Sequence, residues 1–204
     1  MKGAAVPQPM RPSGLVGRLF GLTMDIANAG AYRAALVQAR PAPGGRLIEI
    51  GFGTGALVKR VLGESQVALV AGVDPSPLMV SVAQQRNQEA VTIGRADLRE
   101  GTASELPWPD AYFDTALALH CFQFWANPVA DLTEIRRVLR PAGRLILLLR
   151  AHGNSPPAWL PNPISRSGDE IAGAIALFRQ SGFTEVTLRG KAGSSAIVTG
   201  DRDR

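Results

Sequence analysis

The segment LIEIGFGTG, residues 47–55, joins an apolar run to a turn with three alternating glycines. An almost continuous apolar run is typical of a strand that is covered on both faces of a parallel sheet. Glycine tolerates backbone torsions that other residues avoid, and it lets another group approach the backbone closely. The segment therefore predicts a buried strand that ends in a ligand-binding turn.

Strands and helices alternate along the chain after this segment. Because apolar strands are separated by stretches with helical periodicity, the chain predicts an α/β fold: a doubly wound, mostly parallel seven-stranded sheet with helices on both faces. Only a short glycine-containing turn separates the last two strands, so an antiparallel closing strand is expected. We expect strands at 46–50, 67–73, 97–100, 113–119, 144–149, 183–188 and 194–199, and helices at 57–62, from Ser76 to about Ala90, at 129–139 before Pro141 and Gly143, and at 167–182.

Composition narrows the class of protein. With 204 residues, 46% of them hydrophobic, the chain fits one domain with one core. A single cysteine and two histidines exclude a disulfide framework and disfavour a metal site, which agrees with a reducing cytoplasm. We expect no secretion signal at the start, and no membrane span, because no uninterrupted apolar stretch is long enough.

The net charge of +5 raises the question of an anionic partner, although most basic residues alternate with acids. One window, Ile135 to Gly168, holds six arginines and no acid. The arginines that close its predicted helix oppose the negative end of the helix dipole, which is a structural role. An arginine-rich face that binds an acidic partner stays open as an alternative, whereas nucleic acid is not expected.

Several ligands compete for the glycine turn. A phosphate-binding P-loop is discarded because no lysine and Ser/Thr follow at the required spacing. A dinucleotide fingerprint can be placed on Gly51, Gly53 and Ala56, with Asp74 at a suitable distance for a ribose. Close packing of a strand against a helix would also explain the glycines.

Four segments in order favour another interpretation. EIGFGTG (49–55), VAGVDPSPLMVSVAQQRN (70–87), LPWPDAYFD (106–114) and EIRRVLRPAGRLIL (134–147) together resemble class I S-adenosylmethionine-dependent methyltransferases, in particular the ubiquinone- and menaquinone-methyltransferase-like subgroup. The resemblance implies a Rossmann-like methyltransferase fold with N-terminal arm and helices at 1–45, a cofactor-binding core at 46–150, and an acceptor loop, last helix and closing hairpin at 151–204.

The resemblance implies S-adenosyl-L-methionine as cofactor and S-adenosyl-L-homocysteine as product. Asp74 would bind both ribose hydroxyls, and Glu49 would orient the ammonium of the methionine tail, directly or through water, while repelling a pyrophosphate. Where the family often has Gly-Asp-Ala for the adenine amino group, this chain has Gly101, Thr102 and Ala103, so Thr102, the backbone or Ser104 takes over that contact. The expected cofactor-binding residues are Glu49, Gly51, Phe52, Gly53, Thr54, Gly55, Asp74, Pro75, Ser76, Met79, Thr102, Ala103 and His120.

Methyl transfer needs mainly proximity and alignment, and a general base helps only for some acceptors. His120, at the end of the fourth strand, is the first candidate base or acceptor-positioning residue, and His152 is the second. A Cys121–His120 hydrolase pair is disfavoured because neighbouring residues on a strand point to opposite faces and no nucleophile elbow is present, so a buried thiol is expected.

We expect a small, partly apolar acceptor in a pocket built by the N-terminal helix region and the Pro-rich loop 151–165. A catalytically inactive module of the same fold and an NAD(P)-linked reductase are the competing functions, and a homodimer is left open. Aromatic and apolar side chains that could line the pocket are Phe20, Met24, Tyr32, Phe122, Phe124, Trp125 and Trp159.

Overall fold

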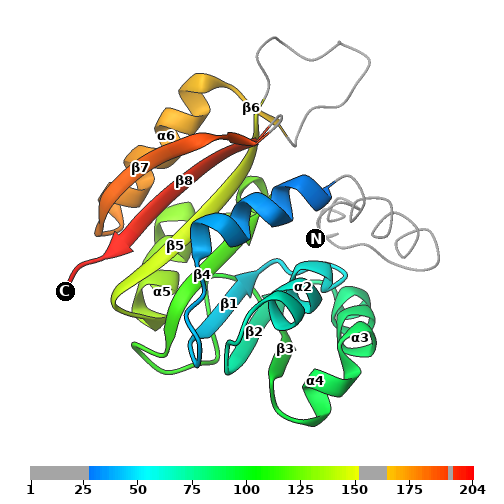
Figure 1. Cartoon of the computed structure of the whole chain (residues 1–204). Coiled ribbons are helices and arrows are strands. Elements are labelled where there is room, and N and C mark those ends of the chain that lie inside the picture. The colour runs from blue at the N-terminus through cyan, green and yellow to red at the C-terminus, as the bar shows by residue number, and fades with distance from the viewer. Residues whose placement is uncertain (1–27, 152–164, 193–194) are drawn as a thin grey trace, which may run out of the picture.

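A computed structural model describes residues 28–151, 165–192 and 195–204. Its elements alternate as expected (Figure 1). None of the helices in these ranges is long and apolar enough to cross a bilayer. The elements are a helix at 28–39, β1 (Arg46–Ile50), α2 (Ala56–Glu64), β2 (Leu69–Asp74), α3 (Pro77–Arg86), α4 (Gln88–Thr92), β3 (Ala96–Glu100), β4 (Phe113–Leu119), the 3₁₀ turn η1 (Phe122–Phe124), α5 (Pro128–Val138), β5 (Leu139–Ala151), β6 (Ser165–Arg166), α6 (Gly168–Gln180), β7 (Phe183–Ala192) and β8 (Ser195–Arg202).

The strands form one sheet in the order β3-β2-β1-β4-β5-β8-β7, and the short strand β6 pairs with β5. Pairs among β1 to β5 are parallel, whereas β8 is antiparallel to both β5 and β7. The predicted seven-stranded, mostly parallel sheet with an antiparallel closing strand is therefore confirmed. The two-residue strand β6 is an addition that the apolar pattern did not indicate.

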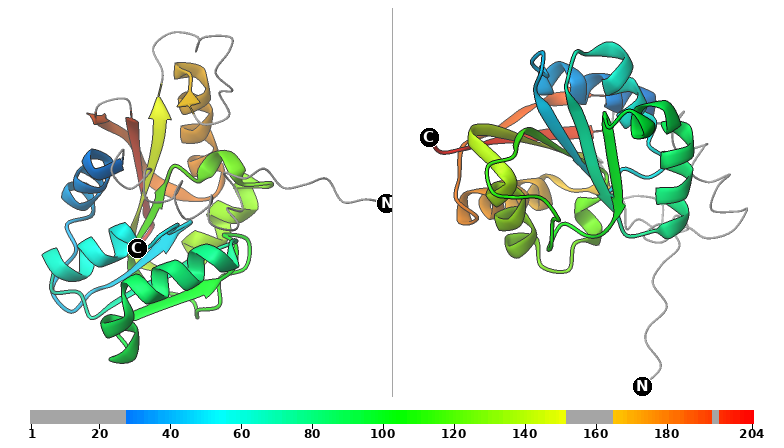
Figure 2. Two further views of the ribbon diagram at one scale, coloured as in Figure 1. Left: turned by 90° about the vertical axis from the view of Figure 1, so that its right-hand side faces the viewer. Right: turned by 90° about the horizontal axis from the view of Figure 1, so that it is seen from below.

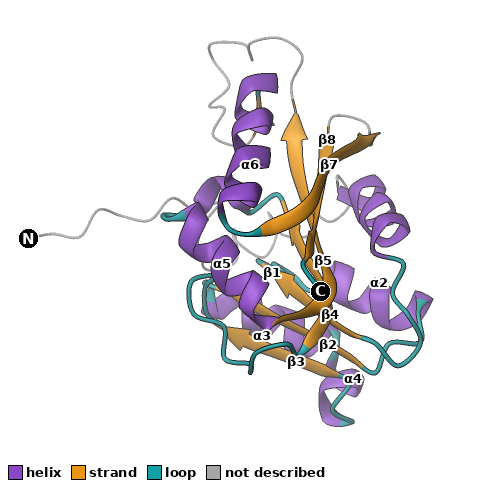
Figure 3. Cartoon of the chain, turned by 90° about the vertical axis from the view of Figure 1, so that its left-hand side faces the viewer, coloured by secondary structure: helices purple, strands orange, loops and turns teal. Residues whose placement is uncertain are grey.

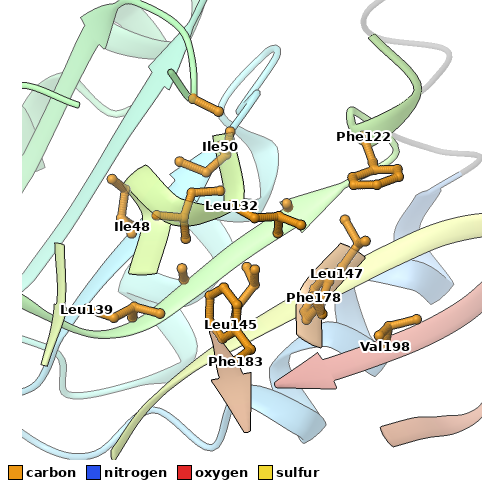
Figure 4. Close-up of a cluster of buried hydrophobic side chains, with 14 of the residues drawn as sticks. Ile48, Ile50, Phe122, Leu132, Leu139, Leu145, Leu147, Phe178, Phe183 and Val198 are labelled. Atoms are coloured by element: carbon orange, nitrogen blue, oxygen red, sulfur yellow. The ribbon is translucent and has the colours of Figure 1, made fainter. Parts of the chain in front are cut away.

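Helices cover both faces of the sheet (Figures 2 and 3), with α5 and α6 on one face and α2 on the other. Consecutive strand residues point to opposite faces, so Leu47 packs with α2 and the helix at 28–39, while Ile48 packs toward α5. Figure 4 shows the α5–α6 side, where Leu132 and Phe178 meet the strand residues. Both faces of the sheet are buried, and the parallel pairing of β1 to β5 places the carboxyl ends of these strands along one edge of the sheet.

The observed bounds differ from the expected ones at several elements, and two of these differences have a clear physical cause. The helix predicted from Ser76 to about Ala90 breaks at Asn87, which separates α3 from α4. The buried Asn87 amide donates to the carbonyls of Gly55 and Ala83, and its backbone leaves helical geometry to do so. The break thus ties α3 to the glycine turn.

The second difference concerns the helix predicted at 129–139. It ends at Val138, before Pro141, and β5 begins at Leu139 instead of 144. The guanidinium of Arg202, from the last strand, donates to the carbonyls of Arg136, Arg137 and Leu139. A cation at a helix C-terminus satisfies carbonyls that lack intrahelical partners.

Candidate cofactor site

A cavity of about 450 Å³ opens at the carboxyl ends of β1, β2, β3 and β4, which is where an open α/β sheet binds its ligands. Residues 101–104 follow β3, and residues 120–127 follow β4. The lining residues are Asn28, Tyr32, Glu49, Ile50, Gly51, Phe52, Gly53, Thr54, Val73, Asp74, Pro75, Met79, Gly101, Thr102, Ala103, Ser104, Leu119, His120, Cys121, Gln123, Phe124, Trp125, Ala126, Asn127 and Asp131.

The three glycines of the turn, Gly51, Gly53 and Gly55, all have positive φ, between 54° and 72°, but they differ in what surrounds them. A Cβ at Gly51 would lie 2.8 Å from the Cβ of Cys121, and a Cβ at Gly55 would lie 2.7 Å from that of Ala83. These two glycines permit close packing. A Cβ at Gly53 would meet no protein atom within 4 Å, so Gly53 leaves open a space that a ligand can occupy.

The turn is held in place from α3. Arg86 donates to the Thr54 hydroxyl at 2.6 Å, and Asn87 donates to the Gly55 carbonyl at 3.2 Å. The Gly51 amide donates to the Val73 carbonyl at 2.8 Å. A ligand therefore meets a turn that is already shaped, which lowers the entropy cost of binding.

Asp74 connects the turns after β1 and β2. Its two carboxylate oxygens accept from the amides of Gly53 at 2.8 Å and Ser76 at 2.9 Å. Burial raises the pKa of the Asp74 carboxyl above its ordinary value, and the two amide hydrogen bonds oppose that rise. Because an ionised carboxylate offers about four lone-pair sites, it can still accept from a diol in the cavity.

The cavity surface beside Asp74 carries further polar side chains, none of them cationic. Glu49, the fourth residue of β1, is only 3% exposed and lines the cavity. The hydroxyls of Thr102 and Ser104 lie 2.8 Å apart and both residues face the cavity, where the family pattern often has an aspartate. Two neutral hydroxyls thus occupy the predicted adenine position.

His120 lies in the cavity wall with φ +54°, a left-handed conformation that is unusual for a residue other than glycine. Its amide donates to the Leu148 carbonyl at 2.9 Å, and its carbonyl accepts from Gln123 at 2.6 Å. Burial and, secondarily, the charge of Arg150 lower the pKa of His120 to about 4. Its buried Nδ1 has no hydrogen-bond partner within the described part of the chain.

Cys121 does not form a reactive pair with His120, but the strand argument for this was wrong. β4 ends at Leu119, and Cys121 is the N-cap of η1. The Cys121 thiol is engaged with the glycine turn, because it donates to the Ile50 carbonyl at 3.1 Å. Burial, followed by the nearby carboxylates of Glu49 and Asp74, raises the pKa of this thiol, which makes it a poor nucleophile.

Most of the predicted site residues line the cavity, with two exceptions among the described residues. Gly55 packs against α3, and Ser76 caps that helix by accepting from the Met79 amide at 3.4 Å. Both support the site from behind its surface. His152 lies outside the described residues, as do Phe20, Met24 and Trp159 of the predicted pocket.

Of the predicted aromatic lining, Tyr32, Phe124 and Trp125 face the cavity, and Phe122 belongs to the core. Four polar lining residues were not predicted from the sequence. A helix N-cap followed by proline, as in Asn127-Pro128, was a usable signal that α5 begins at the rim. The missed residues are Asn28, Gln123, Asn127 and Asp131.

The arginine-rich face is balanced by carboxylates from distant parts of the sequence. Arg136 pairs with Asp203, Arg140 with Asp114 at 2.8 Å, and Arg144 with Asp201 at 2.5 Å. An acid-free window in the sequence is therefore not an acid-free surface. The alternative function as an acidic-partner module is not favoured by this arrangement.

The residues present fit a cationic nucleoside ligand. Among the described residues that line the cavity, three are carboxylates and none is lysine or arginine. This charge balance opposes a diphosphate, and the open space at Gly53 accepts a ligand against the backbone. No cluster of three His, Cys, Asp or Glu side chains within the described ranges could hold a metal ion.

Comparison with known proteins agrees with this chemistry. The family described as a methyltransferase domain matches residues 48–147. The ubiquinone/menaquinone biosynthesis C-methyltransferase UbiE of Vibrio cholerae serotype O1 is 32% identical over 140 residues, covering 65% of this chain and 53% of the relative. The chain thus spans about half the length of the curated relatives it matches.

Solved structures show the same fold. Phosphoethanolamine N-methyltransferase 2 of Haemonchus contortus, solved with S-adenosyl-L-methionine, matches with a TM-score of 0.69 at 16% identity, over 85% of this chain and 52% of that chain. The [4+2]-cyclase SpnF matches with a TM-score of 0.72 at 18% identity, over 98% and 99%. From its family match, its sheet order and its sequence relatives, the chain belongs to the class I S-adenosylmethionine-dependent methyltransferases.

Proposed function

We propose that the protein binds S-adenosyl-L-methionine in the cavity and transfers the methyl group to a small, partly apolar acceptor. The observation that carries the proposal is the preformed, acid-lined space at Gly53, which suits a cation and opposes a pyrophosphate. When bound, the cofactor supplies an electrophilic methyl group on a sulfonium. The protein supplies alignment for an in-line displacement and excludes water.

We assign each part of the cofactor to the residues that line one part of the cavity. Asp74 accepts hydrogen bonds from the ribose hydroxyls, and Glu49 orients the methionine ammonium above residues 51–54. Thr102 and Ser104 contact the adenine ring. Each of these residues lines the cavity.

His120 would position the acceptor more than deprotonate it. A histidine with a pKa of about 4 is neutral at physiological pH and is a weak base, so it suits an acceptor that needs little help in losing a proton. The residue lines the cavity, and its buried Nδ1 has no hydrogen-bond partner within the described structure. Tyr32, Phe124 and Trp125 provide the apolar surface around it.

Calorimetric titration with S-adenosyl-L-homocysteine and, separately, with NADH tests the cofactor. We expect binding of the first alone, and D74N should weaken it about tenfold or more, because the amide group replaces one acceptor oxygen with a donor. The exposed D110N is the matched control and should bind like the wild type. Binding of NADH without S-adenosyl-L-homocysteine would refute the proposal.

A further inference from the structure

The acceptor side of the cavity contains one carboxylate to which the cofactor gives no role. Asp131 lies in the first turn of α5, lines the cavity, and is 5% exposed. It shares this wall with Gln123, Phe124, Trp125 and Asn127, all from the segment that leads from β4 into α5.

A structural role explains only part of this position. An acid in the first turn stabilises a helix through its dipole, but α5 is already capped, since the Asn127 side chain accepts from the Ala130 amide at 3.3 Å. No lysine, arginine or histidine forms a salt bridge with Asp131 in the described ranges. Burial raises the pKa of the Asp131 carboxyl, and a hydrogen bond with the Asn127 backbone opposes that rise.

The surroundings of Asp131 define what it can bind. A carboxylate that keeps lone pairs free toward a cavity is suited to a hydrogen-bond donor or a cation. Phe124 and Trp125 in the same wall add aromatic faces, which attract ammonium groups. His120 is neutral, and no lining residue of the described chain is lysine or arginine. The nearby Arg150 is not a lining residue and donates to the Asn28 side chain at 3.3 Å, so the cavity surface itself offers carboxylates and no cation.

We infer that Asp131 is an acceptor-binding residue and that the acceptor carries an amine, held as an ammonium between this carboxylate and the aromatic side chains. The inference rests on the proposed function, because it assigns the acceptor half of the same cavity. The amine serves as the recognition group of the acceptor.

Three probes with one aromatic body test the inference: 2-phenylethylamine, 2-phenylethanol and phenylacetate. Each is titrated into protein saturated with S-adenosyl-L-homocysteine, using the wild type, D131N and D169N. Asp169 is the matched control because it is also a first-turn acid, on α6, but is exposed and outside the cavity lining.

We expect the wild type and D169N to bind the amine about tenfold more tightly than the alcohol, and phenylacetate weakest. D131N should bind amine and alcohol alike, with unchanged affinity for S-adenosyl-L-homocysteine. An amine preference that survives in D131N, or no amine binding by the wild type at millimolar concentration, overturns the inference. A loss of S-adenosyl-L-homocysteine binding in D131N also overturns it, whereas absence of that binding in the wild type contradicts the proposed function itself.

Discussion

The two halves of the cavity are built in different ways. The wall that we assign to the cofactor, residues 49–54, 73–75 and 101–104, is shaped largely by backbone at strand ends and by glycines with positive φ. The wall that we assign to the acceptor, residues 120–127 with Asp131, is shaped by side chains from a 3₁₀ turn and the start of a helix. A wall made of backbone restricts residue type, so it leaves a pattern in the sequence. A wall made of side chains tolerates many residue types, so it leaves no recognisable pattern in the sequence.

Alanine substitutions at Gly55 and Gly53 distinguish a glycine needed for packing from a glycine that leaves space for a ligand. They are expected to give the largest effects, on the free energy of unfolding and on ligand binding respectively. In G55A the new Cβ meets Ala83 at 2.7 Å with φ +71°, so we expect a loss of about 3 kcal/mol in the free energy of unfolding. In G53A the Cβ enters open space with φ +54°, so the loss is about 1 kcal/mol, while S-adenosyl-L-homocysteine binding is abolished. Urea denaturation and calorimetry measure the two quantities.

Gly63 provides the control for these variants. It lies in α2, and a Cβ at this position would meet no neighbouring side chain within 4 Å. G63A should therefore leave binding unchanged and stabilise the helix by about 0.5 kcal/mol. Equal stability losses in G53A and G55A, or normal ligand binding by G53A, would contradict the division of roles between the glycines.

The same distinction explains which parts of the fold could be predicted. β4 has the predicted bounds, 113–119, because its apolar run is set by burial on both faces. The last helix, expected at 167–182, spans Gly168–Gln180, and Ser167 and Glu170 form a capping box at its start, a signal that depends only on neighbours in sequence. The break at Asn87 and the early end of α5 depend on contacts with Gly55 and Arg202, which are 32 and more than 60 residues away. Local patterns carry no record of such contacts.

A substitution at Arg137 tests how the two walls of the cavity are connected. It donates to the carbonyls of Leu106 and Trp108, each at 3.0 Å, and pairs with Glu134 and Asp110, each at 2.7 Å. This network ties the loop after β3, which carries Thr102, to α5, which carries Asp131. We expect R137M to lower the free energy of unfolding by about 2 kcal/mol, because two carbonyls and two carboxylates lose a charged donor.

The readout for R137M is urea denaturation with ligand titration alongside. R179M, at an exposed arginine of α6, should stay within about 0.5 kcal/mol of the wild type. If both substitutions cost the same, the network has no special role in holding the loop to α5.

The candidate site could be predicted on the cofactor side and only partly on the acceptor side. Glu49, Gly53 and Asp74 were identified because strand ends and glycine turns fix them on the rim. Gln123 and Asp131 were missed because their direction depends on the 3₁₀ turn after β4, which no periodicity indicates. The pairing of arginines with aspartates could not be predicted because the partners are 26 to 67 residues apart in the sequence.

His120 stands at the boundary between the walls and gives the smallest expected effect. Its pKa is lowered to about 4 in the folded protein, whereas in the unfolded chain it stays near the ordinary 6.5. As pH falls from 6.5 toward 4, the unfolded chain takes up a proton that the folded protein refuses, so His120 lowers stability in this window and has no such effect above it. Asparagine tolerates the left-handed backbone at this position, which makes H120N the suitable variant.

The stability of the wild type relative to H120N should therefore fall by about 1 kcal/mol between about pH 7.5 and about pH 5.5, as measured by urea denaturation at each pH. R150Q should shrink this difference, because the nearby cation is the second cause of the lowered pKa. An NMR titration of the His120 ring with a midpoint near the ordinary 6.5 would contradict its burial as the neutral form. It would also restore His120 as a base of ordinary strength, and the acceptor would then no longer need to be one that loses its proton easily.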